Sequence, residues 1–226
     1  MEVGSELLKS DTCVYIYTGK GVVTMFTLYV DDLLLLGADA VLLEIFKKLM
    51  SRFKMADIEN VSHVLGMQIT HDTEKDILTV SQEDYTKSML DRVGMSECKP
   101  LSMLGLGPDL SLEQPDVERM DEVGTMRYQV ITGLVMYLTQ VTHYDIMYAT
   151  TQLARAMSKP SEARMAAAMY LFRYLAGTTG FSIVYKLEGF NSTALGDANW
   201  DNKIENSRPM SSYTIVVSSA PVSLKE

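Results

Sequence analysis

Two adjacent acidic residues interrupt a long apolar run and constrain how that run can fold. Residues 22–30 are rich in Val, Thr, Phe and Tyr, Asp31 and Asp32 follow, and residues 33–36 are four leucines. Because β-branched and aromatic residues favour strands, the pattern predicts a β-hairpin with the two acids at its tip. Hairpin loops prefer Asn-Gly or Asp-Gly, whose residues tolerate positive φ, so two acids are an unusual choice there.

The two carboxylates of this predicted tip favour a divalent cation. Two carboxylates about 4 Å apart repel each other by about 4 kcal/mol at an effective dielectric constant of about 20. Mg²⁺ reverses that repulsion, and it binds through one or two carboxylates together with substrate phosphates. Asp31 and Asp32 are therefore candidate Mg²⁺ ligands, and Mn²⁺ could replace the Mg²⁺. Taken alone, however, an Asp-Asp pair more often marks a solvated turn.

The rest of the chain alternates between strand-like and helix-like patterns. Further strands are predicted over residues 13–17, 64–70, 77–80, 181–185, 194–195 and 213–217. Helices are predicted over residues 40–53, 81–93, 131–141, 142–157 and 161–175 from apolar residues spaced three and four apart. The expected N-caps are Asp39, Ser81 in a capping box with Asp84, and Thr142 paired with Asp145, and Gly94 is the expected stop of the second helix.

Composition restricts the class of protein. The chain has 226 residues and a formal net charge of −9, which argues against a strong non-specific nucleic-acid binder. Its two cysteines and three histidines lack zinc-ligand spacing, and no apolar run approaches the ~20 residues of a membrane span. The acidic N-terminal residues do not resemble a signal peptide. We therefore expect an intracellular, reducing compartment and no membrane partner.

Several sequence blocks, in order, resemble one family. Tyr29-Val30-Asp31-Asp32 resembles the catalytic hairpin of reverse transcriptases. The flanking blocks resemble the Pol polyprotein of copia-type (pseudovirus) retrotransposons. They are residues 10–15, 65–69, 78–85, 99–100, 133–138, 145–146, 173–179 and 220–223.

The resemblance implies an α+β fold in four parts. Residues 1–95 would be the C-terminal half of a reverse-transcriptase palm with the start of the thumb, and residues 96–124 a loop-rich linker. Residues 125–180 would form a helical thumb or connection, and residues 181–226 a truncated N-terminal part of a ribonuclease H-like domain. The implied activity is RNA-directed DNA polymerisation, a two-metal nucleotidyl transfer.

The resemblance also implies roles for single residues. Asp31 and Asp32 would be the catalytic metal ligands, and Tyr29 and Val30 would lie near the primer and nucleotide. The implied partner is an RNA or DNA primer–template, although the acidic net charge weakens this expectation. Asp197, in Gly196-Asp197-Ala198-Asn199-Trp200, would be the first ligand of a vestigial ribonuclease H site.

The sequence departs from the family pattern in ways that put activity in doubt. Family polymerase sites use a third carboxylate from an earlier palm strand, and the nine residues before Ser10 do not carry that motif. Asn199 stands where the family usually has a second acid beside the ribonuclease H ligand. We therefore expect a chain that is inactive alone. Two alternatives remain open, an enzyme completed by another chain and a domesticated module that binds nucleic acid or protein. An unpaired palm edge would also favour self-association.

Overall fold

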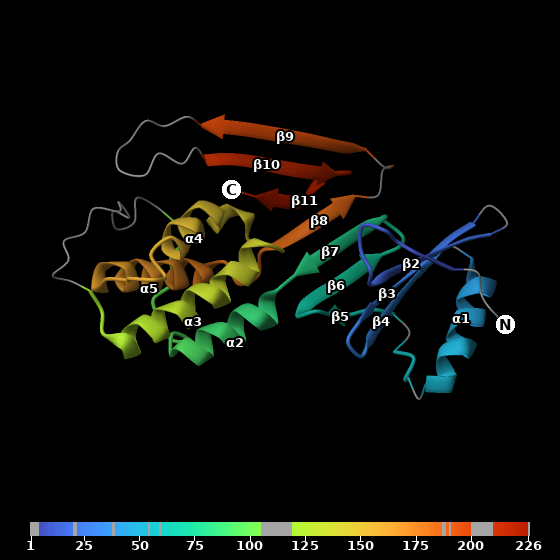
Figure 1. Cartoon of the computed structure of the whole chain (residues 1–226), viewed down its shortest axis with the longest axis horizontal. Helices are drawn as coiled ribbons and strands as arrows, with labels where there is room; N and C mark the ends of the chain where they lie inside the picture. The colour runs from blue at the N-terminus through green and yellow to red at the C-terminus, as the bar shows by residue number, and fades with distance from the viewer. Residues whose placement is uncertain are drawn as a thin grey trace. The chain divides into compact units, whose positions relative to one another are not determined.

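The protein is an α+β chain of two compact units. The computed structural model describes residues 5–19, 22–37, 39–53, 55–58, 60–104, 119–186, 189, 191–199 and 210–225. The units are Met1–Val64 and Leu65–Glu226 (Figure 1). The division into palm, linker, thumb and ribonuclease H parts stays a prediction, and residues 105–118 of the predicted linker lie outside the described residues.

The first unit contains a four-stranded antiparallel sheet whose strands are neighbours in sequence order, β1-β2-β3-β4. The predicted hairpin is confirmed, and its paired strands run in register from Tyr29↔Asp32 to Thr24↔Gly37. The strand predicted over residues 13–17 is β2, which begins one residue later. The four strands are β1 (Glu6–Leu7), β2 (Val14–Gly19), β3 (Val22–Tyr29) and β4 (Asp32–Gly37).

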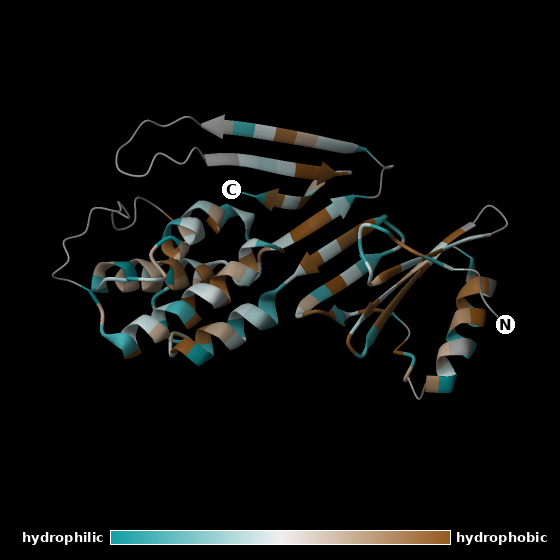
Figure 2. Ribbon diagram, in the orientation of Figure 1, coloured by the Kyte–Doolittle hydropathy of each residue, from teal (hydrophilic) through white to brown (hydrophobic). Residues whose placement is uncertain are grey.

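One helix packs on this sheet. Helix α1 (Ala40–Met50) begins as predicted after Asp39, whose Oδ1 accepts a backbone N–H of the first turn at 3.3 Å. Phe46 is buried against Phe26 of β3, with ring centroids 5.5 Å apart. Figure 2 shows hydrophobic residues along α1 and on the strands of the sheet. The predicted helix is too long, because a 3₁₀ turn (Ser51–Phe53) replaces its last residues and leaves Phe53 71% exposed.

Two antiparallel sheets lie in the second unit. One has the order β6-β7-β8 and the other the order β11-β10-β9. Tyr185 of β8 links them, because its hydroxyl donates to the Pro221 carbonyl oxygen of β11 at 2.6 Å. The strands are β6 (Met67–Asp72), β7 (Ile77–Ser81), β8 (Ser182–Lys186), β9 (Ser192–Asn199), β10 (Met210–Val217) and β11 (Ala220–Lys225).

Two strand predictions need correction. The strand predicted over residues 64–70 is interrupted at Leu65 and Gly66, whose φ angles are +50° and +69°. Positive φ is incompatible with extended backbone, so only the short β5 (His63–Val64) precedes the break and β6 follows it. Strand β11 was not predicted, because it contains Pro221 and alternates weakly between polar and apolar residues.

The helices of the second unit enclose its main core. Tyr128, Val135, Leu138, Phe172 and Leu175 are among its fully buried side chains. The Tyr128 hydroxyl donates to a backbone carbonyl of α4 at 2.8 Å, so this polar group is buried without loss of its hydrogen bond. The helices are α2 (Glu83–Val93), α3 (Glu122–Thr139), α4 (Met147–Ala154) and α5 (Glu162–Gly177).

The predicted start of α2 is wrong in detail, although its predicted stop is confirmed. The N-cap residue is Gln82 rather than Ser81, and the Ser81 Oγ accepts the N–H of Glu83 at 3.1 Å. Asp84 does not close a capping box, because its N–H donates to Gln68 Oε1 at 3.1 Å. Gly94 ends α2 in the left-handed conformation, with φ +75°.

The predicted cap at Thr142 is also wrong. His143 precedes a 3₁₀ turn (Tyr144–Ile146) that leads into α4. The Thr142 hydroxyl is turned away from that turn and donates to Gln82 Oε1 at 2.8 Å. Ser161, which was not predicted as a cap, caps α5, since its Oγ accepts a first-turn N–H at 3.3 Å.

None of the helices in the described ranges is both long enough and apolar enough to cross a membrane.

Candidate functional site

The candidate site is the tip of the β3–β4 hairpin. The loop consists of Val30 and Asp31, between the directly paired Tyr29 and Asp32. Val30 has φ +56°, and Asp31 is not among the residues with positive φ. Positive φ at the first loop position alone is typical of a type II′ turn, where glycine is the usual residue. A β-branched residue there is a backbone outlier, and such outliers cluster at functional sites.

The strand register fixes which sheet face each tip residue occupies. Residues directly opposite in an antiparallel pair share a face, so Tyr29 and Asp32 lie together. The preceding pair, Leu28↔Leu33, lies on the other face, where Phe26 contacts α1. Within the first unit, Tyr29 and Asp32 are therefore on the face that α1 does not cover.

All four residues of the tip are exposed. Tyr29 is 58% exposed and Val30 is 85% exposed. Asp31 and Asp32 are exposed as well, and neither carboxylate has a hydrogen-bond or ion-pair partner among the described residues. The tip therefore offers solvated carboxylate oxygens beside an aromatic ring, with no internal cation to neutralise them.

The donor chemistry of the tip fits Mg²⁺ in part. Carboxylate oxygens are the ligands this ion prefers, and it keeps several waters when only one or two carboxylates bind it. No group of three or more His, Cys, Asp or Glu residues within the described ranges could hold a metal ion. Asp31 and Asp32 supply part of a coordination shell, and any further protein ligand would have to come from outside the described residues.

Comparison with known proteins places this hairpin in a family. A family model described as "Reverse transcriptase (RNA-dependent DNA polymerase)" matches residues 3–104, a range that contains the whole hairpin. The chain is similar, over 95% of its length, to two Pol polyproteins. One is the retrovirus-related Pol polyprotein from transposon TNT 1-94 of Nicotiana tabacum, with 29% identity over 225 residues. The other, from transposon RE1 of Arabidopsis thaliana, is 31% identical over 218 residues.

The chain belongs to the reverse transcriptases of copia-type retrotransposons. It spans only 16% and 14% of the two Pol polyproteins above. It is also 33% identical over 179 residues to an uncharacterized mitochondrial protein of Arabidopsis thaliana, a match that covers 76% of this chain and 70% of that protein. No solved structure matches the chain.

Asp197 of this copia-type chain belongs to the second unit, whereas the hairpin belongs to the first. It is an exposed residue of β9, in the second unit, and pairs with Ser212 of β10. Of its predicted neighbours, Asn199 is described only in its backbone, and Trp200 lies outside the described residues. The structure places Asp31, Asp32 and Tyr29 in one hairpin of the first unit and Asp197 on a strand of the second.

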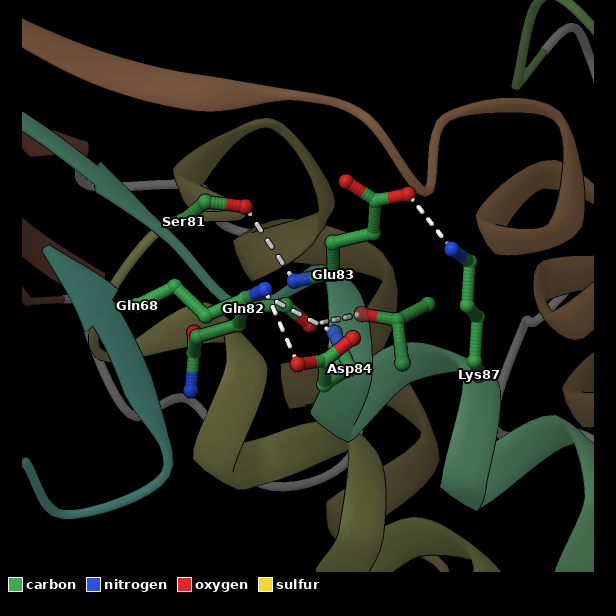
Figure 3. A network of polar contacts seen from close by, with 7 residues as sticks. Gln68, Ser81, Gln82, Glu83, Asp84 and Lys87 are labelled. Atoms are coloured by element: carbon green, nitrogen blue, oxygen red, sulfur yellow. Dashed lines mark hydrogen bonds and ion pairs between the residues drawn. The ribbon is translucent and has the colours of Figure 1, made fainter. Parts of the chain in front are cut away.

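A polar network that no sequence pattern revealed joins β6 to α2 (Figure 3). Gln68 Nε2 donates to Asp84 Oδ2 at 2.9 Å, and the Asp84 N–H donates back to Gln68 Oε1. Beside this pair, the side-chain oxygen of the buried Gln82 accepts a hydrogen bond from the Thr142 hydroxyl. This hydrogen bond ties the start of α2 to the segment that follows α3. The partners are 16 and 60 residues apart in sequence, so no local pattern marks them.

A second cluster that the sequence did not reveal joins the 3₁₀ turn to α5. The Tyr174 hydroxyl donates to Asp145 Oδ2, and the buried His143 places Nδ1 3.4 Å from Asp145 Oδ1. Burial, together with the hydrogen bond to Asp145, raises the pKa of Tyr174 to about 12. Burial alone would raise the pKa of Asp145, but the neighbouring His143 ring and the hydrogen bond from Tyr174 outweigh it and lower that pKa. These interactions stabilise the helical part of the chain.

Proposed function

We propose that this chain carries the catalytic hairpin of an RNA-directed DNA polymerase and that Asp31 and Asp32 are its metal-binding carboxylates. The supporting observation is the pair of adjacent, solvated carboxylates at the tip of a strained hairpin, within the range that the family model matches. Mg²⁺, or Mn²⁺ in its place, supplies charge neutralisation and activation of a primer 3′-hydroxyl when it is bound.

The chain's own residues have separate tasks in this proposal. Asp31 is the main oxygen donor to the ion and Asp32 its helper. Tyr29 shares a sheet face with Asp32 and is exposed, so its ring offers a stacking surface to the end of a primer. Val30 projects its apolar side chain into solvent beside them and contributes to the same primer and nucleotide vicinity.

We assign the larger parts of the chain by family. Residues 1–95 are the palm with the start of the thumb, residues 96–124 a linker, residues 125–180 a thumb or connection, and residues 181–226 the beginning of a ribonuclease H-like domain with Asp197 as a vestigial ligand. The described helices and antiparallel sheets are compatible with these assignments. The edge position of β4 in its sheet supports self-association, which sedimentation at several concentrations would test.

Two carboxylates are too few for full activity in this mechanism. In-line transfer depends on positioned metal ions, and two-metal sites hold them about 3.5 to 4 Å apart. The described residues offer no third acid at the hairpin. The chain by itself therefore binds a metal weakly and does not extend a primer, and a complete site needs a carboxylate from another part of a polyprotein.

A paramagnetic titration tests the metal site. Mn²⁺ added to the full chain should broaden the amide resonances around residues 29–32 first, and Asp31→Asn should remove that broadening. Asp76→Asn is the matched control, since Asp76 is an exposed acid in another turn and asparagine tolerates its φ of +50°. Broadening that is unchanged in Asp31→Asn would refute the assignment of the metal ligands.

Primer extension tests the activity and the partner. We expect the chain to bind a primer–template weakly, with an affinity that falls as salt is raised, and to add no nucleotides. Templated extension by the wild type that Asp31→Asn abolishes would overturn the proposed inactivity while supporting the catalytic role. Binding that ignores salt would contradict contacts to the nucleic-acid backbone.

A further inference from the structure

The second unit has an open groove, and every described residue that lines it belongs to that unit. It has a volume of about 360 Å³ and runs between the end of α2 and residues 123–134 of α3. Six of its described lining residues are apolar and two are arginines: Arg92, Val93, Val123, Met126, Arg127, Val130, Ile131 and Leu134. The groove has no part in the proposed polymerase chemistry.

The α3 side of the groove exposes apolar side chains that a solvent-facing helix surface normally lacks. Val123, Met126 and Val130 are 77%, 62% and 45% exposed. Their spacing of three and four residues aligns them along the helix. The opposite side of α3 already supplies buried residues to the core, so α3 is apolar on two sides, which is typical of a helix covered by a further element.

Positive charge flanks this apolar stripe. Arg92 lies in the last turn of α2 and Arg127 lies on α3, and both are exposed. Neither has an ion-pair partner among the described residues. On a chain of net charge −9, two such arginines beside an apolar groove make a local surface complementary to an acidic partner.

The dimensions of the groove fit a helix. Residues 123 to 134 span about 16 Å along α3, roughly three helical turns. A helix that docks in an apolar groove uses residues spaced three, four and seven apart, as the exposed residues of α3 are. A nucleic-acid duplex would instead require a row of cations matched to its phosphates and a more polar surface.

We propose that the groove between α2 and α3 binds an amphipathic helix of a partner protein, with apolar residues on one face and Asp or Glu beside them. The apolar face packs on Val123, Met126 and Val130, and the acids pair with Arg92 and Arg127. This site is independent of Asp31 and Asp32, so it stands or falls separately from the proposed polymerase role.

Fluorescence anisotropy with two matched synthetic peptides tests the proposal on the full chain. Both peptides carry leucines at helical spacing, and one has glutamates and the other lysines on the remaining face. We expect the glutamate peptide to bind at least about tenfold more tightly than the lysine peptide, with an advantage that shrinks as salt is raised. Equal binding of the two peptides would overturn the proposal.

Variants locate the binding. The double variant Arg92→Glu/Arg127→Glu, and separately Met126→Asp, should each weaken glutamate-peptide binding about tenfold or more. The control Arg155→Glu/Lys159→Glu makes the same charge change at exposed positions after α4 and should bind as the wild type does. All substituted side chains are exposed, so the thermal melts should agree and folding defects are excluded.

Two further results would overturn the proposal. The first is binding of the glutamate peptide that persists in the arginine and methionine variants. The second is displacement of the peptide by a primer–template that itself depends on Arg92 and Arg127, which would make the groove a nucleic-acid surface.

Discussion

Replacing Val30 by glycine should stabilise the β3–β4 hairpin, although it removes an apolar side chain. Val30 has φ +56°, where the Cβ atom is crowded by the backbone at a cost of about 1–2 kcal/mol. Glycine removes that cost but adds about 0.5–1 kcal/mol of chain entropy to the unfolded state. Because Val30 is 85% exposed, little hydrophobic burial is lost, and the net gain is about 0.5–1 kcal/mol.

Hydrogen exchange of the β3 and β4 amides is the appropriate assay. The chain has two units, which can unfold in separate transitions, whereas exchange reports the local opening of the hairpin. A gain of about 0.5–1 kcal/mol should slow exchange about two- to fivefold. The amides of the second unit should exchange at wild-type rates and serve as the internal reference.

The matched control makes the same substitution on the same strand. Val23 is also exposed but is not among the residues with positive φ. Val23→Gly should therefore accelerate exchange, because it loses strand preference and adds unfolded-state entropy with no strain to relieve. If Val30→Gly accelerated exchange as Val23→Gly does, Val30 would not be strained, and the predicted stabilisation of the hairpin by glycine would be refuted.

Three further predictions concern the second unit. A Cβ at Gly177 would lie 2.1 Å from a neighbouring backbone carbonyl oxygen, so Gly177→Ala should lower thermal stability by about 1–3 kcal/mol. Gly133→Ala, where the space is open, should raise stability by about 0.5–1 kcal/mol in the same melts. Thr142→Val should cost about 1–3 kcal/mol in urea unfolding, because it removes the hydroxyl that donates to the buried Gln82 Oε1, and adding Gln82→Leu should recover part of the loss. The raised pKa of Tyr174, about 12, means that the folded state keeps a proton which the unfolded state loses near pH 10. Stability should therefore fall between about pH 10 and 12, and Tyr174→Phe should flatten that fall in alkaline denaturation curves.

Local chemistry explains which elements the sequence could predict. Asp39 and Gly94 mark helix ends because a cap needs only a side chain or a positive φ beside the helix that it ends. The β3–β4 hairpin follows from two strand-like runs with two polar residues between them. In each case the interacting groups lie within a few residues of one another.

The helix caps that were predicted wrongly depend on contacts between distant segments. Ser81 and Thr142 are residue types that often cap helices. The Asp84 N–H, however, donates to Gln68, and the Thr142 hydroxyl donates to Gln82. Such pairings replace a local hydrogen bond with a distant one of similar strength. Sequence spacing alone gives no means of choosing between them.

The candidate site stays a prediction from the resemblance to the reverse-transcriptase hairpin, and its residues also run against local stability. Val30 occupies a position that favours glycine. Asp31 and Asp32 place two solvated carboxylates side by side without a cation among the described residues, and the exposed Tyr29 lies beside them. A stable hairpin requires none of these features, and residues that violate several local rules together are typical of functional sites. A bound cation would account for the acids, and a primer would account for the aromatic ring. The remaining ligands of a polymerase site come from other strands, so the hairpin reveals the kind of chemistry but not the complete site.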